Sequence, residues 1–145
     1  MSRFVIDASV LIKTVVEEDG SAQTLALLES GAALAPDLIM SECANILWKK
    51  TSRGEFTLEE ARLAAQILQR AEFEIAPARM LTERAVEYAV MLEHAAYDCV
   101  YLALAREREM PFVTADARLA RKLNASGTGL AGLVIELGDA PSLLA

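Results

Sequence analysis

Short apolar runs alternate with longer amphipathic stretches along the chain, and this alternation limits the folds open to it. Runs of about four apolar residues indicate buried strands, whereas apolar residues three or four positions apart are typical of helices. Alternation of strands with helical segments favours an α/β fold, with a mostly parallel five-stranded sheet covered by helices on both faces. The predicted strands are residues 3–6, 32–35, 73–76, 111–115 and 133–137, and the predicted helices are residues 9–18, 21–29, 38–53, 57–71, 82–94, 98–109 and 116–123.

The length of 145 residues suits one hydrophobic core, since domains commonly have roughly 100–200 residues. We therefore expect residues 1–145 to form a single domain. No charge-free stretch approaches the roughly 18 apolar residues that a membrane-spanning helix needs, and the N-terminal residues show no signal-peptide pattern. These features predict a cytoplasmic protein that has no contact with membranes.

The composition leaves few residue types that could carry catalysis. Two cysteines, Cys43 and Cys99, are too far apart for a usual zinc site and lie in apolar helical patterns, so we expect both to be buried. The one histidine, His94, falls near the end of a predicted helix, where it would interact with the helix dipole. We therefore leave His94 out of the candidate site. Any chemistry must then rest on carboxylates.

Four acidic residues occupy informative positions. Asp7 and Asp116 follow predicted strands, and Asp98 opens a predicted helix. In an open parallel sheet, ligands bind beyond the carboxyl ends of the strands, which is where these side chains would meet. Aspartate is also a favoured helix cap, and capping alone would account for all three. Capping does not explain Glu42, which has apolar neighbours on both sides along its predicted helix.

Acids gathered in one crevice repel each other unless a cation neutralises them. Oxygen ligands without a histidine or cysteine cluster favour Mg²⁺ or Mn²⁺, and such an ion is suited to phosphodiester hydrolysis. Ser9 and Thr114 lie two residues from Asp7 and Asp116, so their hydroxyls could hydrogen-bond to a carboxylate. The alternative for both hydroxyls is ordinary use in a turn and a strand.

Four motifs resemble those of the PIN-domain family: residues 5–9 (VIDAS), 36–45 (PDLIMSECAN), 95–105 (AAYDCVYLALA) and 112–116 (FVTAD). More closely, the chain resembles the VapC-type toxins of type II toxin-antitoxin systems. The resemblance extends from residue 4 to about residue 137. Each motif is short, but the four occur in the family's order and spacing.

The resemblance implies a three-layer α/β/α fold and Mg²⁺- or Mn²⁺-dependent endoribonuclease activity. Asp7, Glu42, Asp98 and Asp116 match the acidic metal site of the family, and Thr114 matches its hydroxyl position. The family also implies a homodimer, an RNA substrate and a cognate VapB-like antitoxin that lies along the active-site groove. Some members carry a further carboxylate soon after the last aspartate, and residues 117–123 contain none.

The net charge of −7 argues against RNA binding, although four of the negative charges belong to the predicted metal ligands. Basic residues that could line a groove, or simply face solvent, are Lys13, Lys49, Lys50, Arg53, Arg118, Arg121 and Lys122. Asn45 continues the same side of the helix as Glu42.

Two other functions stay open. One is a catalytically weak regulatory binding module on the same fold. The other is a phosphotransfer protein, such as a receiver domain or a haloacid-dehalogenase-type phosphatase, for which the sequence after Asp7 is a poor match because Ala8 and Ser9 follow.

Overall fold

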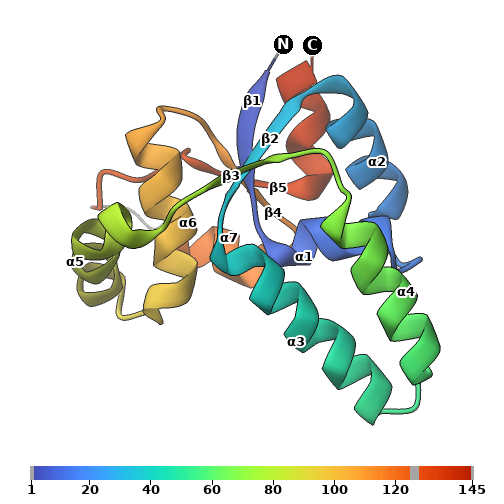
Figure 1. The fold of residues 1–145 in the computed structure, drawn as a ribbon. Coiled ribbons are helices and arrows are strands. Elements are labelled where there is room, and N and C mark those ends of the chain that lie inside the picture. Colours follow the sequence, from blue (N-terminus) through green and yellow to red (C-terminus); the bar gives the residue numbers. More distant parts are fainter. Residues whose placement is uncertain (1, 125–127, 145) are drawn as a thin grey trace.

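A computed structural model describes residues 2–124 and 128–144, and its centre is a sheet of five parallel strands (Figure 1). The strand order is β3-β2-β1-β4-β5, and every neighbouring pair is parallel. This confirms the predicted parallel sheet. The strands are β1 (Arg3–Ile6), β2 (Ala32–Pro36), β3 (Glu74–Ala76), β4 (Phe112–Thr114) and β5 (Val134–Glu136).

Helices cover both faces of this sheet. The α-helices are α1 (Ala8–Leu11), α2 (Ser21–Ser30), α3 (Leu38–Ser52), α4 (Leu58–Gln69), α5 (Thr82–Leu92), α6 (Ala96–Glu107) and α7 (Ala117–Leu123), and the 3-10 helices are η1 (Ile12–Thr14), η2 (Arg79–Leu81) and η3 (Leu137–Leu144). Helices α5 and α6 lie on one side of the sheet, and α2 and η3 lie on the other (Figure 1). The three-layer arrangement is therefore present.

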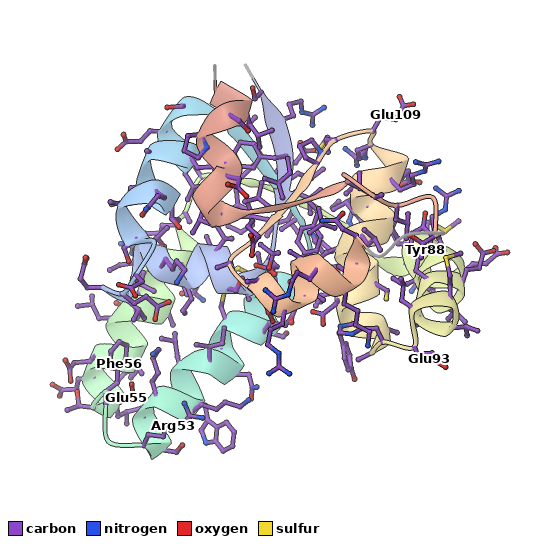
Figure 2. All side chains as sticks on the ribbon, turned by 180° about the vertical axis from the view of Figure 1, so that it is seen from behind. Arg53, Glu55, Phe56, Tyr88, Glu93 and Glu109 are labelled. Atoms are coloured by element: carbon purple, nitrogen blue, oxygen red, sulfur yellow. The ribbon has the colours of Figure 1, made fainter. Side chains whose placement is uncertain are left out.

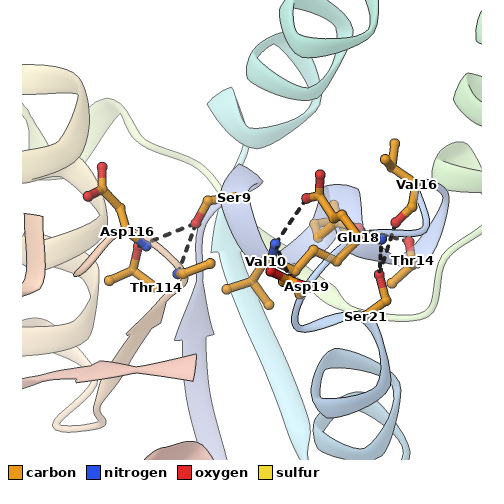
Figure 3. A network of polar contacts seen from close by, with 12 residues as sticks. Ser9, Val10, Thr14, Val16, Glu18, Asp19, Ser21, Thr114 and Asp116 are labelled. Atoms are coloured by element: carbon orange, nitrogen blue, oxygen red, sulfur yellow. Dashed lines mark hydrogen bonds and ion pairs between the residues drawn. The ribbon is translucent and has the colours of Figure 1, made fainter. Parts of the chain in front are cut away.

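The first predicted helix, residues 9–18, is wrong in its extent. The chain forms the short α1 and η1 and leaves helical geometry after Thr14. The Ser21 hydroxyl explains this, because it accepts a hydrogen bond from Glu18 N at 3.1 Å and donates one to Val16 O at 3.0 Å (Figure 3). These bonds use backbone groups that a continuing helix would need.

Local sequence explains where other helices begin. The predicted capping box is present at α4, where Thr57 and Glu60 exchange hydrogen bonds between side chain and backbone. Asp37 stands at the start of α3, but its side chain makes no capping hydrogen bond. The predicted start of a helix at Asp98 is wrong, since α6 begins two residues earlier, at Ala96. The C-terminal helix η3 is a further element that the sequence patterns do not predict.

The core surrounds the central strand β1, in which Phe4, Val5 and Ile6 are completely buried. Burying a side chain of this kind stabilises the fold by roughly 1.5–3 kcal/mol. Cys43 and Cys99 are buried free thiols, as predicted. Among the residues that the structure describes, no helix is long and apolar enough to cross a membrane.

The α3–α4 hairpin extends beyond the sheet, away from the end where the two chain termini lie (Figure 1), and Arg53 and Glu55 lie at its far end (Figure 2). Residues that follow the carboxyl ends of the strands therefore gather near the base of this hairpin.

Candidate functional site

Asp7 lies where β1 ends and α1 begins, and it is almost completely buried, with 7% of its surface exposed. Its Oδ1 atom accepts hydrogen bonds from Val10 N at 3.2 Å and from Ser9 Oγ at 2.5 Å. Burial raises the pKa of Asp7 to about 6, although these hydrogen bonds oppose the rise. The carboxylate thus caps a helix and also carries the electrostatic cost of a buried charge.

Thr114 joins two of the predicted site segments. Its buried hydroxyl donates a hydrogen bond to Asp7 Oδ2 at 2.6 Å and accepts one from Asp116 N at 3.2 Å. The Ser9 hydroxyl lies 3.3 Å from that of Thr114 and accepts a hydrogen bond from Ala115 N at 3.0 Å (Figure 3). The ends of β1 and β4 are therefore held together by two hydroxyl groups beside one buried carboxylate.

Asp116 begins α7, and its side chain caps that helix by accepting a hydrogen bond from Leu119 N at 3.0 Å. Unlike Asp7, it is exposed. Its backbone is linked to Thr114, whereas its carboxylate turns toward the start of α7. Asp116 therefore stands at the solvent edge of the group.

Glu42 reaches the site from α3. The hydroxyl of the buried Tyr101 donates a hydrogen bond to its Oε1 atom, and the Tyr101 ring stacks on Phe112 with centroids 5.6 Å apart. Burial raises the pKa of Glu42, and the negative charges of Asp98 and Asp7 raise it further. Sequence patterns missed Tyr101, because it lies 59 positions from Glu42 and its apolar helix suggests only a core residue.

Asp98 lies in the first turn of α6, and its Oδ2 atom is 2.6 Å from Nε2 of His94. His94, which is not among the predicted site residues, is thus in contact with one of them. No sequence pattern indicates this contact, because His94 lies between α5 and α6 and the four-position spacing therefore does not fall within one helix. The chain bends between the two residues, yet the contact is kept.

The structure brings three of the predicted acids into electrostatic contact. The charge of Asp98 raises the pKa of Asp7 and of Glu42, and the charge of Asp7 raises that of Glu42. Among the described residues, neither Asp7 nor Glu42 forms an ion pair with a basic side chain. Such a set of hard, mutually repelling oxygen donors fits a divalent cation.

The carboxylates do not converge on a single point. Within residues 2–124 and 128–144, no group of three histidine, cysteine, aspartate or glutamate side chains is arranged as ready metal ligands. Hydrogen bonds from Thr114 and Tyr101 hold Asp7 and Glu42 instead. The oxygen atoms and negative charges of these residues therefore suit a divalent cation, but their side chains are not already arranged in a metal-coordinating geometry.

Two cavities flank Asp98 and His94. One, of about 530 Å³, has Glu42, Asp98 and Lys49 in its lining. The other, of about 390 Å³, is lined by His94, Asp116, Arg118, Leu119 and Lys122. Carboxylates and basic side chains thus line both cavities, which is an arrangement suited to a phosphate chain bound beside a cation.

Some basic side chains are already paired with acidic or carbonyl groups of the protein. Lys13 Nζ lies 2.9 Å from Glu18 Oε1 and also donates to the Asp19 carbonyl, while Lys50 lies between Glu18 and Glu55. These two lysines tie the loop after η1 to the end of α3. Lys122 Nζ likewise donates a hydrogen bond to Glu93 O at 2.9 Å. Among the described residues, the basic side chains that line the two cavities without such a bond are therefore Lys49 on α3 and Arg118 on α7.

The fold and this site define a class of protein: an α/β domain with a carboxylate-lined crevice at the carboxyl edge of a parallel sheet. The model of the PIN domain matches residues 4–123, and the chain belongs to that family.

Known relatives agree with this assignment. Ribonuclease VapC1 of Mycobacterium tuberculosis is 31% identical over 123 residues, which cover 83% of this chain and 90% of the relative. PAE2754 from Pyrobaculum aerophilum has a similar structure, with a TM-score of 0.70 and 22% identity, over 98% of this chain and 89% of that one. VapBC2 from Rickettsia felis, bound to a DNA fragment from its promoter, matches with a TM-score of 0.65 and 14% identity, over 92% and 98% of the two chains.

Proposed function

We propose that this chain is a metal-dependent endoribonuclease and the toxin of a VapBC-type toxin-antitoxin pair. One observation carries the proposal: Asp7, Glu42 and Asp98 share a field of negative charge, and neither of the first two has a basic partner among the described side chains. Similarity to Ribonuclease VapC1 over most of the chain supports RNA as the substrate.

Asp7, Glu42, Asp98 and Asp116 would hold the ion, Mg²⁺ or Mn²⁺. When bound, such an ion lowers the pKa of a coordinated water and stabilises negative charge on phosphate oxygens. Thr114 and Ser9 orient Asp7 through their hydrogen bonds, and Tyr101 orients Glu42. These contacts fix the carboxylates before the substrate arrives, so less reorganisation is needed during the reaction.

The partners follow from the relatives rather than from the geometry. The name of VapBC2 from Rickettsia felis pairs a VapB with a VapC, which supports a VapB-like antitoxin for this chain. We also propose a homodimer, a cytoplasmic location and one domain over residues 1–145. Exposed apolar side chains on α4 and α5 offer surface for protein contacts; they are Leu58, Leu63, Ile67, Val86, Val90 and Met91.

Cleavage of a cellular RNA pool tests the function. Purified, antitoxin-free protein is incubated with the RNA in Mg²⁺, in Mn²⁺ and in a chelator, beside an Asp98→Asn variant, and the new RNA ends are sequenced. We expect discrete cuts that need the metal and are lost in the variant. If folded, metal-loaded protein makes no cuts, the binding-module alternative takes the place of the nuclease.

A further inference from the structure

The larger of the two cavities differs from the other in its chemistry. Its volume of about 530 Å³ lies between α3 and the start of α6, and it combines the carboxylates of Glu42 and Asp98 with the apolar side chains of Leu38 and Ile46. An apolar lining with a few convergent polar groups is typical of a site for an organic ring rather than for phosphate alone.

One wall of this cavity is a row of polar side chains on α3. Ser41, Asn45 and Lys49 are spaced four positions apart, so they lie along one side of the helix, and all three line the cavity. Within the described part of the chain, none of these side chains takes part in a hydrogen bond or ion pair with the protein. Their donors and acceptors are available to a ligand.

Across the cavity from α3 lies Tyr97, which directly precedes Asp98 in the first turn of α6. Tyr97 is 73% exposed, a high value for so large an aromatic side chain. An exposed ring beside a catalytic carboxylate is well placed to stack on a base, because single-stranded RNA is recognised largely through unstacked bases on aromatic side chains.

We propose that this cavity binds one unstacked nucleobase of single-stranded RNA next to the bond that is cut. The base packs against Tyr97, Ser41 and Asn45 bind its edge, and Lys49 binds a neighbouring phosphate. The smaller cavity, with Arg118 and Lys122 and no aromatic side chain, takes the sugar-phosphate chain on the other side of Asp98. This inference rests on the proposed function, whose substrate it describes.

The test separates base binding from backbone binding. Asp7→Asn protein in Mg²⁺ serves as an uncleaving background, with wild-type protein in chelator as a second. The probes are fluorescein-labelled decamers of rA, rU and rC and a decamer of abasic ribose phosphates, and the dissociation constants are measured by fluorescence anisotropy. Adding Tyr97→Ala should weaken binding of the base-containing decamers by about 5- to 100-fold and leave the abasic decamer unchanged.

Three further variants serve as controls. Tyr97→Phe keeps the ring and should preserve the preference for bases. Lys49→Ala should weaken binding of base-containing and abasic decamers alike, with a salt dependence reduced by about one phosphate contact. Trp48→Ala removes an exposed aromatic side chain on α3 outside this cavity, and it should leave the preference unchanged.

The outcomes distinguish this inference from the function on which it rests. If wild-type protein cuts RNA but Tyr97→Ala weakens all decamers equally, or none, the base site is wrong and the nuclease stands. If the wild type neither cuts RNA nor binds any decamer, both fail. If Tyr97→Ala dissociates a dimer in light scattering without changing the preference for bases, the surface belongs to a second copy of the chain.

Discussion

The two sides of the candidate site are built in opposite ways. On the β1–β4 side, Asp7 and Thr114 are buried, and each oxygen of the Asp7 carboxylate accepts a hydrogen bond from the protein. On the α3–α6 side, the Asp98 side chain is 34% exposed, and Tyr97 faces solvent. The first side is fixed by its own contacts, whereas on the second the Tyr97 ring and the row of polar side chains on α3 are available to a ligand.

This difference indicates that one side serves the chemical step and the other serves ligand binding. A buried carboxylate with a raised pKa is costly to the fold, so it fits a role in chemistry rather than in stability. Exposed side chains without partners have little effect on the stability of the fold, and they can determine which ligand is bound. Substitutions on the buried side should therefore alter turnover and stability together, whereas those of Tyr97 or of the row of polar side chains on α3 should alter binding alone.

The largest expected effect is the loss of cleavage in Asp7→Asn. Asp7 would hold the cation that stabilises the transition state, and loss of one such stabilising group commonly lowers turnover by about 10²–10³-fold, so we expect at least this loss in single-turnover cleavage of RNA. The control is Asp139→Asn, which changes an exposed acid on η3 outside the site. A cleavage rate in Asp7→Asn equal to that of the control would contradict the central role of the buried side.

The same variant should be more stable than the wild type when metal is absent. Because burial raises the pKa of Asp7 from 3.8 to about 6, the folded protein holds a proton that the unfolded chain releases. The free energy of unfolding of the metal-free wild type should therefore fall by about 2–3 kcal/mol as the pH rises from about 4 to above 6. The raised pKa of Glu42 acts in the same direction.

Urea unfolding at several pH values in chelator measures this trend. In Asp7→Asn the decline should be much smaller, and above pH 6 the variant should unfold at a higher urea concentration. Added Mg²⁺ should stabilise the wild type more than the variant, because metal binding to the folded state offsets the repulsion. Parallel pH profiles for the two proteins would show that Asp7 is not under electrostatic strain.

How far the sequence predicts the fold depends on the range of the interactions. The strands and most helices follow from apolar periodicity, because burial of one face determines them. The predicted helix over residues 9–18 is wrong in its extent because the Ser21 hydroxyl forms hydrogen bonds with backbone groups of Val16 and Glu18. Apolar periodicity does not reveal such competing hydrogen bonds. η3 has no clear pattern of its own and packs mainly against α2.

The site shows the same limit. Asp7, Thr114 and Asp116 could be predicted to lie together, since parallel strands end at a common edge. The partners of Glu42 and Asp98 could not, because the contact with Tyr101 depends on how α3 and α6 pack, and the contact with His94 crosses a bend between two helices. Long-range packing determines which hydroxyl or imidazole meets each carboxylate.

Thr114→Val should have the next largest effect, because it keeps the shape of a buried side chain and removes only the hydroxyl. Asp7 Oδ2 then loses its donor, and Asp116 N loses its acceptor. We expect about a 10- to 100-fold loss of cleavage and about 1–3 kcal/mol of lost stability. Thr114→Ser restores the hydroxyl and should recover most activity. Failure of the serine variant to do so would assign the loss to packing instead.

The smallest effect is expected at Tyr101→Phe, which lies at the boundary between the two sides. The ring and its stacking on Phe112 remain, and only the hydrogen bond to Glu42 is removed. Because Glu42 is half-buried rather than buried, water can replace the lost donor. We therefore expect about a 10-fold loss of cleavage at low Mg²⁺, which higher Mg²⁺ largely restores.

Cleavage across a Mg²⁺ titration, together with direct Mn²⁺ binding followed by electron paramagnetic resonance, separates weaker metal binding from slower chemistry. Tyr88→Phe, in the buried face of α5, is the matched control and should leave both curves unchanged. A loss that persists at saturating Mg²⁺ would place Tyr101 with the fixed, buried side of the site, and the boundary between the two sides would then move from Glu42 to Asp98.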